Sequence, residues 1–271
     1  FYSSSFNQPI GSWDVSNVTN MQQMFRSAAL FNQPLSNWDV GRVTNMSETF
    51  AFATFFNQDI GSWDVSNVTN MYRMFRQSGF NKLIVNWNVS KVQNMKEMFS
   101  YASSFNKSIQ KWDVSSVTDM KGMFSYATSF NQSLSTWDVS NVEDFSIMFQ
   151  GADSFNQPIG DWDITNASTL NSMFKNATSF NQDIGNWDIS NALSIVGIFN
   201  LASSFNQDIS GWNTSGIKSL ISVFEGASSF NTSINSWDTS SLERISRMFK
   251  DATSFNQPLS SWDTSNVFDM N

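Results

Sequence analysis

The residues of this chain best suited to chemistry are aspartates that follow its tryptophans with a period of about 25 residues. They are Asp14, Asp39, Asp64, Asp113, Asp138, Asp163, Asp188, Asp238 and Asp263, and the same position holds Asn88 and Asn213 in two copies. Carboxylate and amide oxygens are the ligands that Ca²⁺ prefers, so this column is a candidate weak calcium site. An exposed column would also present an acidic face to a cationic partner or a polar glycan.

A local structural role for the same aspartates competes with ion binding. In the repeated D-x-S-N sequence, the aspartate can accept backbone N–H bonds in a turn or at a helix start, which favours its charged form. On a sheet face, neighbouring carboxylates would lie about 5 Å apart and would repel one another by about 1 kcal/mol or more per pair. Because that repulsion needs an offset, we favour the local role, and we expect no cofactor other than calcium.

Catalysis is not expected from these carboxylates. The chain has no Cys and no His, which removes thiol nucleophiles, Cys/His zinc sites and histidine-based acid–base mechanisms. A glycosidase needs two carboxyl groups about 5 to 10 Å apart, but a carboxylate repeated in every copy has no unique partner. We therefore predict that the protein is not an enzyme.

Charge and hydropathy restrict the partners further. The formal net charge is −8 and the sequence pI is about 4.4, so we expect no nucleic-acid partner. No apolar stretch is long enough to span a bilayer, so we expect no membrane span in this window. The sequence opens and stops partway through a repeat, and we therefore expect a fragment of a longer chain whose signal and anchor lie elsewhere.

The elements that position these residues are tandem repeats. All 11 Trp residues lie on one ladder that begins with Trp13, Trp38 and Trp63. A Phe-Asn pair stands seven residues before each Trp, and its asparagines begin with Asn7, Asn32 and Asn57. We predict that the tryptophans form a structural ladder in the core. The asparagines are expected to form an internal ladder of stacked amides that bond the bends of adjacent turns, because a buried polar group persists only when it is hydrogen-bonded.

Apolar spacing predicts one helix and one strand in each repeat. Val18, Met21, Met24, Phe25 and Ala28 fall on one face of a helix, and Ser or Thr precedes this segment as a helix cap. Ile10, Trp13 and Val15 follow leucine-rich-repeat spacing and are expected to form a short strand. The expected fold is an α/β solenoid over residues 1–271, a right-handed, leucine-rich-repeat-like coil of about eleven 25-residue turns with one short parallel strand and one short helix per turn. An all-strand β-helix is the alternative, which the helical spacing disfavours.

The repeat resembles a known family. Its consensus, A-x-x-F-N-Q-x-I-x-x-W-D-V-S-N-V-T-N-M-x-x-M-F, is similar to the repeat of BspA-like surface proteins, including the mycoplasma-type surface-lipoprotein repeat, and residues 56–71 reproduce it almost completely. The resemblance covers essentially the whole chain. It implies a leucine-rich-repeat-like solenoid in secreted or surface-anchored proteins that are often linked to adhesion.

These observations together predict a non-enzymatic, extracellular or cell-surface scaffold. We expect it to present an extended face to a protein or glycan on a cell surface. The alternative is a structural subunit that associates with copies of itself into a fibre, sheath or filament.

Overall fold

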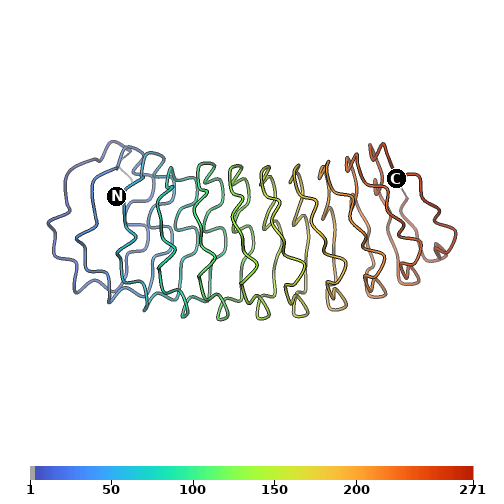
Figure 1. The fold of residues 1–271 in the computed structure, drawn as a ribbon, viewed down its shortest axis with the longest axis horizontal. Helices are drawn as coiled ribbons and strands as arrows, with labels where there is room; N and C mark the ends of the chain where they lie inside the picture. The colour runs from blue at the N-terminus through green and yellow to red at the C-terminus, as the bar shows by residue number, and fades with distance from the viewer. Residues whose placement is uncertain (1–3, 271) are drawn as a thin grey trace.

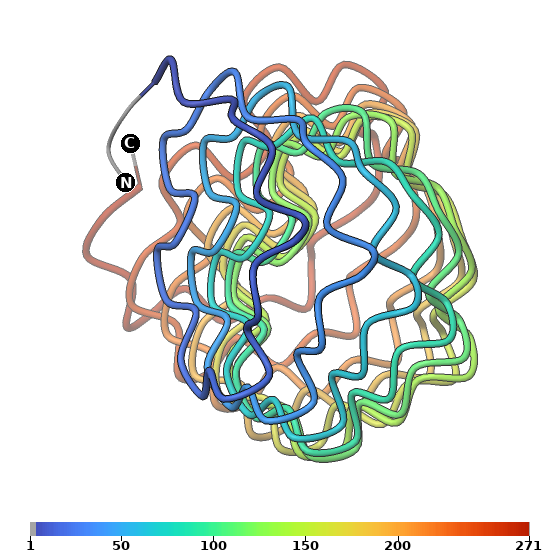
Figure 2. The same cartoon turned by 90° about the vertical axis from the view of Figure 1, so that its left-hand side faces the viewer.

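The computed structural model of the chain describes residues 4–270, which wind into a row of similar coils (Figure 1). Viewed along the long axis, successive coils lie one behind another around a common interior (Figure 2). One buried apolar cluster runs from Ile10 to Met248 without a break between separate cores. The protein is therefore a tandem-repeat solenoid, as the sequence period predicted.

The helix predicted for residues 18–28 and their equivalents is wrong, because the described residues form no helix. In the first coil, alternate N–H groups of this segment donate to carbonyls of the next coil at 2.8–2.9 Å: Met21 to Asn45, Gln23 to Ser47, Phe25 to Thr49 and Ser27 to Ala51. The N–H groups between them close turns onto the carbonyl three residues earlier, as Met24 does onto Met21. An α-helix needs these donors for bonds within the segment, and here half of them join neighbouring coils.

Left-handed backbone at two positions of each coil produces this pattern. In the first coil these positions are Gln23 and Ser27, with φ of 59° and 62°. Among the described residues, all 16 non-glycine and 4 glycine residues with positive φ lie in the two columns that these positions start. A left-handed residue at every fourth position interrupts helical winding and turns alternate N–H groups toward the next coil. Even the β-branched Ile147 adopts it, at φ 54°, so the stack overrides local preference.

The strand predicted at Ile10 to Val15 is also wrong. Instead, two tight turns occupy this segment, with the N–H of Trp13 bonded to Ile10 and the N–H of Val18 bonded to Val15. In the described residues, β-structure is limited to isolated parallel bridges on one column. They are Asn20↔Asn45, Asn45↔Asn70, Asn70↔Asn94, Asn94↔Asp119, Asp119↔Asp144, Asp144↔Thr169, Thr169↔Ser194, Ser219↔Arg244 and Arg244↔Asp269.

Three aromatic columns fill the interior of the solenoid. Within a coil, the rings of Phe25 and Phe31 stack with centroids 4.2 Å apart, and each ring stacks again on its equivalent in the next coil. The tryptophans form the third column, in which the Trp38 indole N–H also donates to the Ile10 carbonyl of the previous coil at 3.1 Å. The same indole bond recurs from coil to coil as far as Trp262. Ring stacking and indole bonds therefore join every coil to the next.

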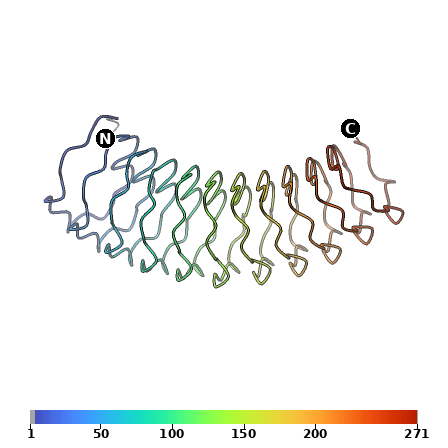
Figure 3. The same ribbon diagram turned by 45° about the horizontal axis from the view of Figure 1, so that its top comes forward.

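Unequal spacing of these columns bends the solenoid. Equivalent ring centroids of adjacent coils are 5.3–5.8 Å apart in the Phe25 column, 5.7–6.3 Å in the Phe31 column and 6.3–6.5 Å in the Trp38 column. Bridged backbone, as in the Asn20 column, lies about 4.8 Å apart. The coils are thus closest at the bridges and widest at the tryptophans, and the whole stack curves into an arc whose edges differ in spacing (Figure 3).

One coil is a residue shorter than the rest and depends on a glycine. Only four residues separate Phe75 from Phe80, where other coils have five. The shortened loop brings Gly79 so close to the previous coil that a Cβ there would lie 2.3 Å from the Thr54 carbonyl oxygen. Any larger residue at position 79 would clash with the previous coil, so this loop can be one residue shorter only because the position holds glycine.

Candidate functional site

The aspartate column forms one local turn per coil. In all nine aspartates Oδ1 accepts the backbone N–H of the residue two positions later at 2.9–3.1 Å. In five of them it also accepts a Ser or Thr hydroxyl at 2.6–2.7 Å, as at Asp163 and Thr165. Asn88 and Asn213 make the same two bonds through their amide oxygen. The column therefore repeats a turn that either side chain can close.

These hydrogen bonds favour the charged form of six of the aspartates. The hydroxyl of Ser16 and then its backbone N–H lower the pKa of Asp14 below its ordinary value, and Thr165 does the same for Asp163. The pKa values of Asp64, Asp188, Asp238 and Asp263 are lowered by the equivalent serine. The charge of Asp188 raises the pKa of Asp163, but this is the smallest of its causes. Local hydrogen bonding therefore outweighs repulsion along the column.

The geometry gives a calcium ion few ligands. Each coil contributes at most one carboxylate to the column, and one oxygen of that carboxylate already accepts turn hydrogen bonds. Among residues 4–270 no three His, Cys, Asp or Glu side chains gather where they could hold a metal ion. Ca²⁺ takes six to eight oxygen ligands, so calcium at this column stays a prediction for experiment.

The two structural ladders predicted from the sequence lie in different places. Trp38 and Trp63 are buried, whereas Trp13 in the first described coil is 48% exposed. The asparagine ladder runs along the surface rather than inside the coil, which corrects its predicted position. Its bonds join side chain to backbone: Asn7 Oδ1 accepts the Asn32 N–H at 3.0 Å, and Asn32 Oδ1 accepts the Asn57 N–H at 3.0 Å. Each asparagine thereby fixes the start of the next coil's Trp segment.

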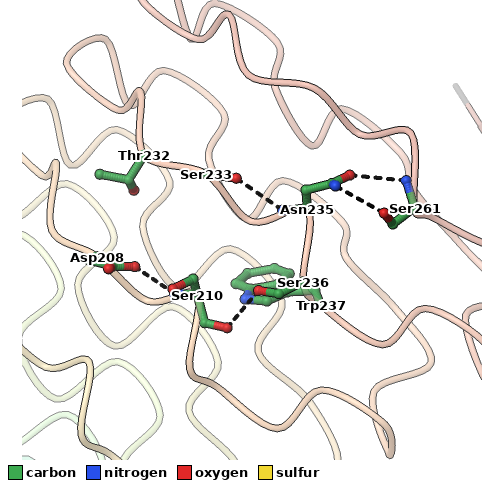
Figure 4. A pocket seen from close by; sticks show the side chains of 8 residues that line it. All are labelled: Asp208, Ser210, Thr232, Ser233, Asn235, Ser236, Trp237 and Ser261. Atoms are coloured by element: carbon green, nitrogen blue, oxygen red, sulfur yellow. Dashed lines mark hydrogen bonds between the residues drawn. The ribbon is translucent and has the colours of Figure 1, made fainter.

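The aspartate column is one edge of a surface band that we call the polar strip. In each coil the strip begins at the residue after the Phe-Asn pair and ends at the aspartate position after the Trp, as in residues 207–213 and 232–238. A hollow of about 720 Å³ in this strip lies between three coils (Figure 4). Side chains of Asp208, Ser210, Thr232, Ser233, Asn235, Ser236, Trp237 and Ser261 line it. Two further hollows overlap these positions in other coils, one around Lys111 and Thr136 and one around Pro9 and Pro34.

Hydrogen bonds between coils hold the walls of this hollow. Asn235 spans to the next coil, where its amide donates to the Ser261 hydroxyl at 2.9 Å and accepts the Ser261 N–H at 3.0 Å (Figure 4). The Ser236 hydroxyl donates to the Ser210 carbonyl at 2.7 Å. On the opposite wall, Ser210 lowers the pKa of Asp208 through its hydroxyl and its N–H. The hollow thus presents hydroxyl, amide and carboxylate groups in fixed positions, which suits hydrogen bonding to a polyhydroxylated ligand.

Sequence reasoning identified the aspartates but missed the hollow. Ser210, Asn235 and Ser261 come from three coils and gather only when the coils stack. The available signal was a Gly or polar residue two positions before ten of the 11 Trp residues, as at Gly11, Ser36 and Ser210.

Comparisons with known proteins place the chain in a family. The family model described as "Mycoplasma protein of unknown function, DUF285" matches residues 1–108, 76–187 and 169–271. Among solved structures, the chain is similar to an internalin from Listeria monocytogenes, with 13% identity, coverage of 87% of this chain and 74% of that chain, and a TM-score of 0.31. The comparison with curated proteins gave no match. Residues 4–270 contain no helix that is long and apolar enough to span a bilayer. Since the three matched segments together cover the whole sequence, the chain belongs to the DUF285 family of Mycoplasma proteins of unknown function.

Proposed function

We propose that the chain is a non-enzymatic scaffold displayed on a cell surface, and that its polar strip binds a glycan. The observation that carries the proposal is the recurrence of the strip: hollows that share the positions directly before the Trp appear between adjacent coils in three parts of the solenoid. A row of similar polar hollows suits a polymer with repeating hydroxyl groups. The similarity of the repeat to surface proteins linked to adhesion supports display outside the cell.

Charge narrows the class of glycan. Between residues 132 and 263 the polar strip contains eight aspartates and no Lys or Arg. Hydrogen bonds lower the pKa values of Asp163, Asp188, Asp208, Asp238 and Asp263, so this part of the strip stays negative at neutral pH. An anionic polysaccharide would be repelled, and the ligand is therefore a neutral or amino-sugar glycan.

A glycan array probed with the full chain tests this proposal. We expect binding to neutral or amino-sugar glycans that falls by about 10-fold in Asn235→Ala, because that side chain bridges two coils at the hollow. Gln22→Ala is the matched control, since it removes an exposed amide on another part of the coil and should leave binding unchanged. Preferential binding of sulfated or carboxylated glycans, or equal loss in both variants, would contradict the proposal.

Self-association is a second candidate, favoured by exposed apolar side chains on adjacent coils. Leu30 and Phe55 occupy equivalent positions and are 48% and 63% exposed. Negative-stain imaging and size-exclusion chromatography over a range of concentrations separate the two functions. Concentration-dependent rods that disappear in Phe55→Ser would favour assembly, whereas monomers that bind a glycan favour adhesion.

A further inference from the structure

A second surface, separate from the polar strip, carries an ion-pair network that links four coils. Arg26 pairs with Glu48 at 3.1 Å, and Arg73 lies 3.7 Å from the same carboxylate. Arg73 also makes two bonds to Glu97, from Nε at 3.0 Å and from Nη2 at 2.9 Å, and Arg76 pairs with Glu97 as well. The carboxylates lie at the base, with side chains 8% and 13% exposed, and the guanidinium groups lie above them.

Aromatic rings lie among these guanidinium groups. Phe52 is between Arg26 and Arg76, whose guanidinium carbons are 5.6 and 5.8 Å from its ring centroid. Arg76 is also 5.8 Å from the ring of Tyr101, which stacks on Tyr126 at 4.7 Å. We call this surface the arginine–aromatic face, and it comprises Arg26, Phe52, Arg73, Arg76, Tyr101 and Tyr126.

The backbone projects the aromatic rings of this face outward. Phe52, Tyr101 and Tyr126 belong to a left-handed column, with φ of 62°, 59° and 56°. The same column holds glycine at Gly151 and Gly226, which adopt such φ values without steric cost. Gly151 also leaves room for Tyr126, because a Cβ there would lie 2.5 Å from the tyrosine ring. The stack imposes this φ on every residue of the column, and at these three positions the side chain it places on the surface is aromatic.

The arginines of this face outnumber their carboxylate partners. Arg26, Arg73 and Arg76 share only Glu48 and Glu97. The network therefore keeps a net charge of about +1, in a molecule whose formal net charge is −8.

We propose that the arginine–aromatic face docks a carboxylate-rich polypeptide segment of a partner protein. Guanidinium groups recognise carboxylates through paired hydrogen bonds, and the exposed ring of Tyr101 would cover apolar or aromatic side chains beside those carboxylates. Tyr and Arg are the residues that dominate binding energy in protein interfaces. The ion pairs already hold the arginines in place, so docking costs less side-chain entropy. This site is independent of the glycan site on the polar strip.

Fluorescence anisotropy with a labelled glutamate–tyrosine copolymer tests the proposal on the full chain. We expect salt-sensitive binding that weakens by about 10-fold in Tyr101→Ala and in Arg76→Lys, which keeps the charge but loses the planar fork. Leu201→Ala is the matched control, because Leu201 has the same backbone position and is 46% exposed, against 45% for Tyr101. The control should change the affinity by less than about 2-fold.

Three results would overturn the proposal: no binding of the copolymer, equal loss in Leu201→Ala and Tyr101→Ala, or tighter Tyr101-dependent binding of hyaluronate, which would make the ligand an anionic glycan. Because both variants replace exposed or half-exposed side chains, an unchanged melting temperature verifies that they fold. Tyr101→Ala should also leave glycan-array binding intact, and that readout separates failure of this site from failure of the polar strip.

Discussion

At the scale of single residues, the aspartates of the repeat have a defined structural task. Each accepts hydrogen bonds two residues ahead, and asparagine performs the same task at Asn88 and Asn213. The turn therefore requires an acceptor oxygen at this position and does not require a negative charge.

Substitution of Asp163 separates the turn from ion binding. Asp163→Asn keeps the acceptor and should change stability by less than about 0.5 kcal/mol, whereas Asp163→Ala loses the bonds to Thr165 and should cost about 1 kcal/mol. Urea denaturation measures both. The turn role also predicts the same melting temperature with and without calcium. A calcium-induced rise that Asp163→Asn abolishes would instead establish an ion site.

The lowered pKa values set a pH dependence. Because the folded pKa of each of these aspartates lies below its unfolded value, their contribution to stability is present above about pH 3.9 and is lost as the pH falls through the folded pKa. We expect the melting temperature to hold from pH 7 to pH 5 and to fall below pH 4. A lower melting temperature at pH 6 than at pH 3 would show that repulsion outweighs the turn bonds.

At the scale of elements, each coil replaces a helix by turns with two left-handed residues. The apolar spacing of Val18, Met21 and Phe25 fits both arrangements, because both bring every third or fourth side chain to one face. The difference was visible in one feature of the sequence: Gly122, Gly151, Gly197 and Gly226 fall inside the segment assigned to a helix, where glycine is unfavourable. Likewise, two turns satisfy the spacing of Trp13 and Val15 as well as a strand does.

Substitutions at Ser172 distinguish the left-handed turn from a helix by the sign of the stability difference between the glycine and alanine variants. Ser172 has φ 55°, so Ser172→Gly should give a protein more stable than Ser172→Ala by about 1 kcal/mol. In a helix the order would be reversed by a similar amount. Chemical denaturation of the two variants decides between them, and a more stable alanine variant would refute the left-handed column.

At the scale of the whole molecule, period and composition were sufficient to predict the solenoid and its buried aromatic columns. The candidate sites were harder to predict from the sequence. The Asp–Ser turn could be inferred because its partners are two residues apart, but the hollow at Asn235 and the pairing of Arg73 with Glu97 join residues 24 to 26 positions apart, whose register depends on stacking. Curvature also arises only at this scale, from the difference between the spacing of bridges and that of tryptophans.

Removal of one ring from the stack should affect the molecule beyond its own coil. Trp137 is buried, lies 6.3 Å from the Phe124 ring and donates to Ile109, so Trp137→Ala should cost about 3–5 kcal/mol and loosen adjacent coils. Lys121→Ala, at a half-buried surface position, should cost less than about 0.5 kcal/mol. Equal unfolding midpoints for the two variants would contradict the assignment of interior and surface.

Hydrogen exchange resolved by residue tests the stacked coils most directly. The account predicts that slow exchange extends through every interior coil and includes the alternate N–H groups that donate to the next coil, such as those of Met46, Glu48, Phe50 and Phe52. Protected blocks separated by freely exchanging linkers would contradict it, because they would show independent globules in place of one continuous interior.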